Sequence, residues 1–268
     1  MLAVDSLSIE AIRRRLTAAT VGRQIYLFGQ IDSTNARLKT LARGGAREGT
    51  VVLAEGQTAG RGRHGRPWFS PSGVNLYASV LFRPALRLKD AGVFSLIAGL
   101  GLADAVKDLG VSPSIKWPND VLVGRKKVGG SLVECAPRGD EIEWAILGVG
   151  VNLNVDPAAL REALGESGLF ATSLSTITGQ EIDRNAFAAS YLNHLDAWAR
   201  VFETTGAEPI LAAWRQRDIL GGRRVEVRGS PGGYEGRVLG IDPSGGLHVR
   251  DTLGRAHTVT GEEIRILD

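Results

Sequence analysis

The stretch that decides the fold runs from Gln57 to Trp68 and reads Gln-Thr-Ala-Gly-Arg-Gly-Arg-His-Gly-Arg-Pro-Trp. It follows the strand-like run Thr50–Glu55 and formally contains the G-x-G-x-x-G spacing of dinucleotide-binding folds. That fingerprint requires a helix to begin there, because the helix N-terminus binds the pyrophosphate. Pro67 and Pro71 disfavour such a helix. A kinase-type glycine loop is excluded too, because no catalytic-loop or D-F-G set follows.

The same loop has the composition of an anion site. Its glycines let backbone N–H groups approach an anion, and the forked guanidinium groups of Arg61, Arg63 and Arg66 match phosphate oxygens. Three arginines so close together repel one another unless an anion lies among them. We therefore expect a loop that is mobile when empty and ordered with its ligand. A solvated basic turn and an RNA-binding arginine–glycine segment remain alternatives.

Outward from this loop, helices and strands follow one another in irregular order. Hydrophobic periodicity and capping residues predict helices at 7–17, 34–43, 90–109, 183–204 and 208–217, a short helix after Asp156, and strands at 24–28, 50–55, 76–82, 114–117, 128–135 and 142–154. Asp90 is the expected cap of the third helix. Strict strand–helix–strand alternation is absent, which favours an α+β fold with a mixed sheet and flanking helices.

The hydrophobic pattern of the sequence changes near Gly221. Short alternating segments separated by Gly, Pro, Ser and Asp turns continue to the end of the chain. This pattern is typical of a small antiparallel β-barrel. We therefore predict two domains, a larger one at 1–219 and a small barrel at 220–268.

Composition narrows the classes of function. The chain has 268 residues, of which 32 are Lys or Arg and 29 are Asp or Glu, a net charge of +3. The three loop arginines equal this excess, which indicates a local anion site rather than a nucleic-acid face. No apolar run approaches the ~18 residues of a membrane span. The N-terminus lacks a secretory layout and Cys135 is the single cysteine, so we expect a cytoplasmic protein.

A second segment, Lys116-Trp117-Pro118-Asn119-Asp120, places a lysine at the end of an apolar strand. Pro118 excludes a helix interior. A lysine beside Ile115 and Trp117 is costly without an anionic partner. It either extends to solvent or serves as an electrostatic catalyst that contacts a carboxylate and a phosphate.

Five blocks together resemble the biotin protein ligases. They are Asp32–Asn35, Gln57–Arg66, Lys116–Val121, Lys127–Gly130 and Leu147–Asn154. The resemblance is strong over residues 23–155 and weaker in the C-terminal barrel, which it identifies as SH3-like next to a catalytic domain of the class II synthetase and biotin ligase type.

The resemblance implies a role for each matched residue. Lys116 and Arg61 would be catalytic. The biotin site would comprise Ser33, Thr34, Asn35, Gln57, Arg61, Gly62, Arg63, Lys116, Gly129 and Gly130, where a side chain at either glycine of the last pair would clash with the ligand. The ATP and adenylate site would comprise Arg61, Arg63, His64, Arg66, Trp68, Lys116 and Asn152. No metal ligands are expected from the protein.

The implied reaction uses ATP with Mg²⁺ to convert biotin to biotinyl-5'-AMP, and then transfers biotin to a lysine of a biotin carboxyl carrier protein. Asp120 is a candidate for accepting the proton of that lysine, and no role is expected for Cys135 as a nucleophile. A lipoate or other acyl-acid ligase on a related fold is the main alternative, and a nucleic-acid-binding module without catalysis is the second. Neither nucleic acid nor membrane is an expected partner, and a homodimer is left open.

Two departures from the family pattern stand out. Ser131 occupies a position where the family usually has a bulky aliphatic residue, which affects the expected packing around biotin. Only about 22 residues precede the matched part, too few for the winged-helix repressor module of some bacterial members, so no repressor activity is expected.

Overall fold

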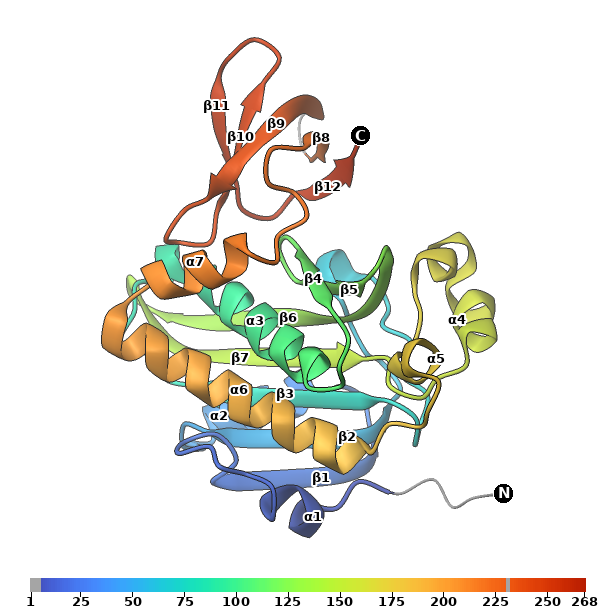
Figure 1. The fold of residues 1–268 in the computed structure, drawn as a ribbon. Helices are drawn as coiled ribbons and strands as arrows, with labels where there is room; N and C mark the ends of the chain where they lie inside the picture. The colour runs from blue at the N-terminus through green and yellow to red at the C-terminus, as the bar shows by residue number, and fades with distance from the viewer. Residues whose placement is uncertain (1–5, 230–231) are drawn as a thin grey trace.

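The computed structural model describes residues 6–229 and 232–268, so the first five residues of the predicted larger domain lie outside the described part. A seven-stranded sheet with helices on both faces forms the larger unit, and a five-stranded sheet lies beyond the β4 edge (Figure 1). The predicted division at residues 219 and 220 falls between the last helix of the first unit and the first strand of the second.

The large sheet is mixed, as predicted. Its first two strands are parallel and every other pair is antiparallel. From one edge to the other the order is β1 (Gln24–Ile31), β2 (Thr50–Gln57), β3 (Leu76–Phe82), β7 (Glu141–Val151), β6 (Lys126–Arg138), β5 (Asp120–Val123) and β4 (Pro113–Lys116). The parallel pair is connected by α2 (Thr34–Arg43), which therefore begins where β1 ends.

Two hydrophobic layers hold this sheet. The α2 helix covers one face through Leu38 and Ala42, which pack on Val52, Leu81 and Ile146. The helices of the opposite face form the larger core and are α1 (Ile9–Arg13), α3 (Val93–Lys107), α6 (Arg184–Thr205) and α7 (Glu208–Arg215) (Figure 1). Because α3 lies between the sheet and α6, most of its residues are apolar and buried.

Three short helical segments, α4 (Pro157–Leu164), η3 (Gly165–Phe170) and α5 (Leu174–Thr178), connect β7 to α6. Asp156 caps α4 through a bond from the Ala158 N–H, and Pro157 is its first residue, as the sequence predicts. None of the helices in the described ranges is long and apolar enough to cross a lipid bilayer.

Several details differ from the sequence prediction. The first helix is shorter than the predicted 7–17, and η3 and α5 were not predicted. Asp90 does not cap α3, because it closes the separate 3-10 turn η2 (Leu88–Asp90), and α3 begins after Gly92. The segment after Lys116 also contains an additional strand, β5. A turn at Trp117–Asn119, with a cis peptide bond before Pro118, joins it to β4. Strand alternation over four residues is too short to be recognised beside so many turn residues.

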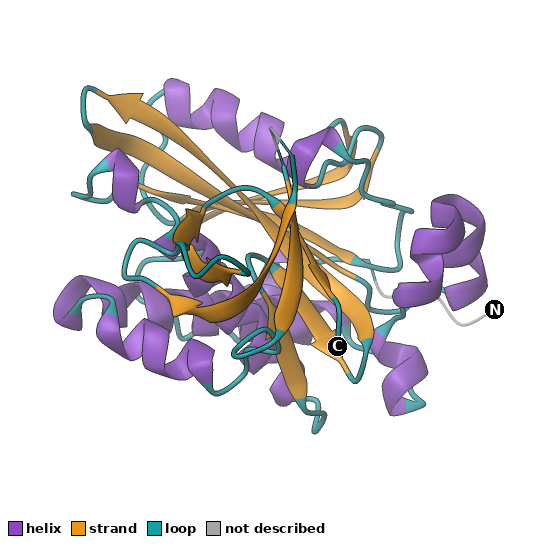
Figure 2. Cartoon of the chain, turned by 90° about the horizontal axis from the view of Figure 1, so that it is seen from above, coloured by secondary structure: helices purple, strands orange, loops and turns teal. Residues whose placement is uncertain are grey.

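The C-terminal unit is an antiparallel sheet, as predicted. Its strand order is β11 (Ala256–Val259), β10 (Leu247–Asp251), β9 (Tyr234–Ile241), β8 (Arg224–Arg228) and β12 (Glu263–Ile266). Within the described residues no ladder joins β11 to β12, so the barrel is not closed. Figure 2 looks at the molecule from the side of this unit. The indole N–H of Trp117 donates to the Gly245 carbonyl at 3.0 Å and fastens the unit to the larger one.

Candidate active site

The first part of the site forms where α2 begins. The parallel register sets Ile31 beside Gln57, so the Asp32–Asn35 and Gln57–Arg66 blocks meet. Gln57 Oε1 accepts a hydrogen bond from the Thr34 N–H at 2.9 Å and thereby caps α2 from outside. Ser33 is the N-cap residue, yet its hydroxyl makes no capping bond. Ser33 and Thr34 are both buried, so their hydroxyl groups belong to the interior of the site.

A second layer of polar groups supports this first one. Ser79 of β3 is fully buried, and its Oγ lies 2.8 Å from Thr34 Oγ1 and 2.6 Å from Asn35 Oδ1. The Asn35 side-chain N–H donates to Glu134 Oε2 at 2.9 Å. We call Ser33, Thr34, Asn35, Gln57 and Ser79 the polar floor. Ser79 and Glu134 were not identified from the sequence, because only strand pairing places them below α2.

Glycines keep the sheet open beside the polar floor. Gly148 and Gly150 face the same side as α2, and a Cβ atom would lie 2.1 Å from Asn35 Oδ1 at the first and 2.4 Å from Trp68 Nε1 at the second. Gly130, opposite Gly150, also faces this side, where a Cβ would lie 3.2 Å from Asp120 Oδ1. The glycines of the last matched block are therefore required by close side-chain approach.

Gly129, which was predicted to lie against the ligand, faces the other side of the sheet from Gly130. Neighbouring strand residues point to opposite faces, so a Cβ at Gly129 would be 3.0 Å from Leu102 of α3. Ser131 lies on the same face as Gly129, opposite Val149. It is buried and its hydroxyl has no hydrogen-bond partner among the described residues. The serine at this position thus leaves the α2 side of the sheet unchanged.

Lys127 lies beside Asp120 and Trp68, although no role was predicted for it from the sequence. Its ammonium group pairs with Asp120 at 2.5 Å and lies 5.2 Å from the ring centre of Trp68. The indole N–H of Trp68 is buried against Gly150 and has no hydrogen-bond partner in the described part of the chain. The sequence feature that could have identified Lys127 is its position in the Lys127–Gly130 block, three residues before Gly130.

Lys116 approaches the site from its edge. In the sheet it is opposite Asp120, which is opposite Gly130, so all three share the α2 face. A hydrogen bond from Arg66 lowers the pKa of Glu263, and the charge of Lys116 lowers it further. Lys116 ends β4, the edge strand beyond which the C-terminal unit lies (Figure 1). Asn152, also buried, uses one amide hydrogen on the Thr172 carbonyl at 3.1 Å.

The glycine–arginine loop, residues 60–68, bridges the two units. Arg63 lies 5.8 Å from the ring centre of Trp117 and donates to the Gly261 carbonyl at 3.0 Å. Arg66 pairs with Glu263 at 2.6 Å. Burial lowers the pKa of Arg63, while Asp120 and Glu262 act in the opposite direction.

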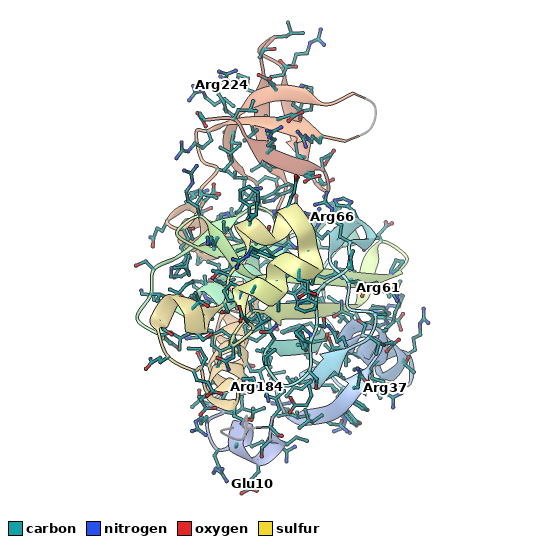
Figure 3. The ribbon with its side chains drawn as sticks, turned by 90° about the vertical axis from the view of Figure 1, so that its right-hand side faces the viewer. Glu10, Arg37, Arg61, Arg66, Arg184 and Arg224 are labelled. Carbon is teal, nitrogen blue, oxygen red and sulfur yellow. The ribbon has the colours of Figure 1, made fainter. Side chains whose placement is uncertain are left out.

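Arg63 and Arg66 thus find acceptors in the C-terminal unit even without an anion, so two of the three loop arginines do not need an anion to hold them. Figure 3 shows Arg66 next to that unit and Arg61 lower on the same side of the molecule. Arg61 and His64 are exposed. His64 has a φ of 56°, and with Gly62 and Gly65 it forms the tight turn η1 (Arg63–Gly65).

The described residues contain no group of three His, Cys, Asp or Glu side chains that could hold a metal ion. Burial raises the pKa of Cys135 to about 11, and Glu134 adds to this effect. The thiolate is therefore scarce at neutral pH, which agrees with the prediction that this cysteine is not a nucleophile.

Comparison with known proteins supplies a context for this geometry. Residues 27–152 match the model of the biotin/lipoate A/B protein ligase family. The chain is 37% identical to a biotin–[acetyl-CoA-carboxylase] ligase of Mycobacterium tuberculosis, over 95% of this chain and 93% of the relative. It is 33% identical to the bifunctional ligase/repressor BirA of Bacillus subtilis, over 92% of this chain and 76% of the relative.

Solved structures agree with these relatives. The biotin protein ligase from Aquifex aeolicus in complex with biotin and ATP superimposes with a TM-score of 0.77 at 28% identity, covering 91% of this chain and all of the other. The biotin protein ligase from Leishmania major in complex with biotinyl-5-AMP gives a TM-score of 0.60 at 27% identity, covering 88% of this chain and 98% of the other.

Proposed function

This chain belongs to the biotin protein ligase family, and we propose that the site around Thr34, Lys127 and Arg63 performs the family's two steps. The chain is an ATP-dependent enzyme that activates biotin and transfers it to a protein. The observation that carries the assignment is the meeting of a buried polar floor with a cluster of cations on one face of the sheet. A neutral polar ring fits the first part and an acyl phosphate fits the second.

The polar floor would bind the ureido ring of biotin. Ser33 and Thr34 have buried hydroxyl groups at the start of α2, and Gln57 is fixed beside them. Asn35 would act from behind, since both ends of its amide already bond to Ser79 and Glu134. Gly130 would let the ligand pass close to the sheet.

The cations would bind the phosphate end. The carboxylate of biotin and the α-phosphate of ATP are both anions, so their repulsion is part of the barrier. Lys116 and Lys127 would reduce it from the sheet, and Arg61 and Arg63 from the loop. His64 and Arg66 would add positive charge near the other phosphates of ATP. Gly62 would let the backbone of the loop close over them.

Trp68 and Asn152 would lie on the adenine side, where Trp68 packs against the glycine backbone at Gly150. Mg²⁺ would enter with ATP and be held mainly by its phosphates, where it would neutralise charge. The carboxylate oxygen attacks the α-phosphorus and pyrophosphate leaves. The acceptor amine then attacks the acyl carbon and AMP leaves. Asp120 would take the proton of that amine, or orient Lys127 through their ion pair.

We also propose the wider setting. The acceptor would be a biotin carboxyl carrier domain, and the division into a catalytic domain at 1–219 and a C-terminal domain at 220–268 would let the second cover the first. The single cysteine suits a cytoplasmic setting. The modest net charge of +3 argues against nucleic acid as a partner, and the chain would act as a monomer or a homodimer.

The direct test is to incubate the protein with ATP, labelled biotin and a biotin carboxyl carrier domain. Label is expected on the carrier, and its absence with a folded protein would contradict the assignment. The family model also covers lipoate ligases. Isotope exchange between ATP and pyrophosphate separates the two substrates, because the proposed enzyme supports exchange with biotin and not with lipoate.

A further inference from the structure

A continuous chain of side-chain contacts runs through the polar floor, at the end of the site proposed to bind biotin. Glu134 Oε2 accepts from the Asn35 amide at 2.9 Å, Asn35 Oδ1 lies 2.6 Å from Ser79 Oγ, and Ser79 Oγ lies 2.8 Å from Thr34 Oγ1. Ser79 is fully buried, and Asn35 and Thr34 are nearly so. Each hydroxyl group has one hydrogen to donate, so the position of every hydrogen in this chain can be worked out.

The direction of the chain is set at Glu134. An ionised carboxylate only accepts hydrogen bonds, so the amide nitrogen of Asn35 must face it. The Leu132 carbonyl, 3.3 Å from the same nitrogen, favours this orientation as well. The reverse orientation of the amide would place its oxygen against two acceptors. Asn35 Oδ1 therefore faces Ser79, and it can only accept.

The remaining hydrogens follow from this. Ser79 donates its single hydrogen to Asn35, so between the hydroxyl groups of Ser79 and Thr34 the donor must be Thr34. Without that donation, two lone pairs would face each other at 2.8 Å. The contact of Thr34 Oγ1 with Gln57 Oε1 is longer, at 3.2 Å, and Gln57 already accepts from the Thr34 N–H. The hydroxyl hydrogen of Thr34 is thus used in the bond to Ser79, and Thr34 Oγ1 can only accept a hydrogen bond from a ligand.

We propose that Glu134, Asn35 and Ser79 are positioning residues that fix Thr34 Oγ1 as a hydrogen-bond acceptor and so select a ligand that carries an N–H at this point. The inference rests on the proposed function, in which the ligand ring is a cyclic urea with two N–H groups. A buried acceptor left without a donor loses its hydration, so a ring lacking that N–H is penalised. We call the chain of contacts from Glu134 through Asn35 and Ser79 to Thr34 the relay. A dithiolane ring has no N–H, and the relay therefore discriminates against it.

The test uses analogues of biotin in which either ureido N–H is replaced by oxygen, giving two cyclic carbamates. The ratio of kcat/KM for biotin to that for each carbamate is measured by ATP–pyrophosphate exchange. For wild type we expect one carbamate to be disfavoured by about 10–100-fold, because an oxygen then faces Thr34 Oγ1.

In Ser79→Ala the Thr34 hydrogen is free to turn and donate to the ring oxygen. The ratio for that carbamate is expected to fall about 10-fold or more toward 1, mainly through KM. Loss of packing alone would weaken biotin and both carbamates alike. Ser131→Ala is the matched control, because Ser131 is also a buried β-strand serine but lies on the opposite face of the sheet, and its ratio should equal that of wild type.

Glu134 allows a second test at the far end of the chain, should Ser79→Ala fail to fold. Glu134→Ala releases the Asn35 amide and is expected to reduce the ratio in the same direction, whereas Glu134→Gln still offers an oxygen acceptor and should preserve it. An unchanged ratio in folded Ser79→Ala or Glu134→Ala, with an active wild type, overturns the relay alone. A wild type that shows no biotin-dependent exchange overturns the proposed function instead, and the relay with it.

Discussion

The polar floor and the glycine–arginine loop bound the same site, but they are held in place differently. Around Thr34, Asn35 and Ser79 the hydrogen bonds are short, buried and contained within the large sheet and α2. In the loop, Arg63 and Arg66 bond to the C-terminal unit, and the Arg66 pair is largely exposed. The end proposed to recognise biotin is therefore held by contacts within one unit, while the proposed phosphate end is assembled from two units.

This difference suits the two substrates. A neutral ring gives little binding energy with which to order a protein, so its site must be preorganised. ATP brings several charges, and these can compete with Glu263 and the Gly261 carbonyl for the arginines. The proposed closure of the loop would then be an exchange of partners, and it would also exclude water from the unstable anhydride.

The largest expected effect concerns the anchoring of the polar floor. Arg184 of α6 is 2% exposed and pairs at 2.7 Å with Glu55, two residues before Gln57 (Figure 3). Arg184→Ala leaves the largely buried carboxylate of Glu55 without its cation, although the Leu7 N–H still donates to it, and the free energy of unfolding should fall by about 3 kcal/mol. Denaturant unfolding measures this. The exposed pair of Arg138 and Glu141 is the control, and an Arg138→Ala change of equal size would contradict the argument.

Removing a cation from the phosphate end should reduce chemistry and leave folding intact. Lys116→Ala and Lys127→Ala are each expected to lower adenylation by on the order of 10²–10³-fold, by analogy with the loss of one transition-state donor. ATP–pyrophosphate exchange gives the rates, and Lys126→Ala, at an exposed neighbouring position, is the control. Near-full adenylation by either folded variant would remove that lysine from the proposed mechanism.

Filling a site glycine tests whether the two regions meet at Trp68. In Gly150→Ala the new methyl group would lie 2.4 Å from the indole nitrogen, so Trp68 must move or the strand must shift. The expected cost is about 1–3 kcal/mol, as weaker ATP binding or lower stability. Titration with ATP and thermal unfolding separate these outcomes. Gly29→Ala, in a strand position with open space around it, should change neither ATP binding nor stability. Equal losses in Gly29→Ala and Gly150→Ala would show that contact with Trp68 is not the cause.

The smallest effect is expected at the loop. Glu263→Ala removes an exposed ion pair of about 0.2–1 kcal/mol, so protease cleavage within residues 61–66 should accelerate by no more than about fivefold. Biotin with ATP should slow cleavage in wild type and in the variant. Glu235→Ala, which breaks another exposed pair of the C-terminal unit, should leave cleavage unchanged. Indifference of wild-type cleavage to both ligands would show that the loop does not close.

Local patterns in the sequence predicted most elements of the fold, and they brought the Asp32–Asn35 and Gln57–Arg66 blocks to attention as parts of one candidate site. The α2 cap region, the buried α3 helix and the antiparallel C-terminal unit follow from periodicity and turn residues, and the structure confirms them. The second layer could not be predicted in this way. Ser79 lies in an apolar strand and Glu134 in another, and their meeting with Asn35 depends on strand register across three segments.

The same limit applies to the glycines and the lysines. Gly129 and Gly130 are neighbours in the chain but face different partners, which only the assembled sheet reveals. Lys127 and Lys116 share one face although the sequence distinguished only the second. The partners of Arg63 and Arg66 lie almost 200 residues away in the chain, beyond the reach of any local pattern.

The glycines at Gly130, Gly148 and Gly150 have a consequence for redesign. A pocket is commonly enlarged by trimming bulky side chains from its walls, but at these three positions the sheet carries no side chain to trim. New room for bulkier acids would have to come from the side chains packed over the sheet, chiefly Trp68 and the first turn of α2, which carries the groups proposed to recognise biotin. Breadth of substrate and fidelity to one substrate would therefore compete for the same few positions.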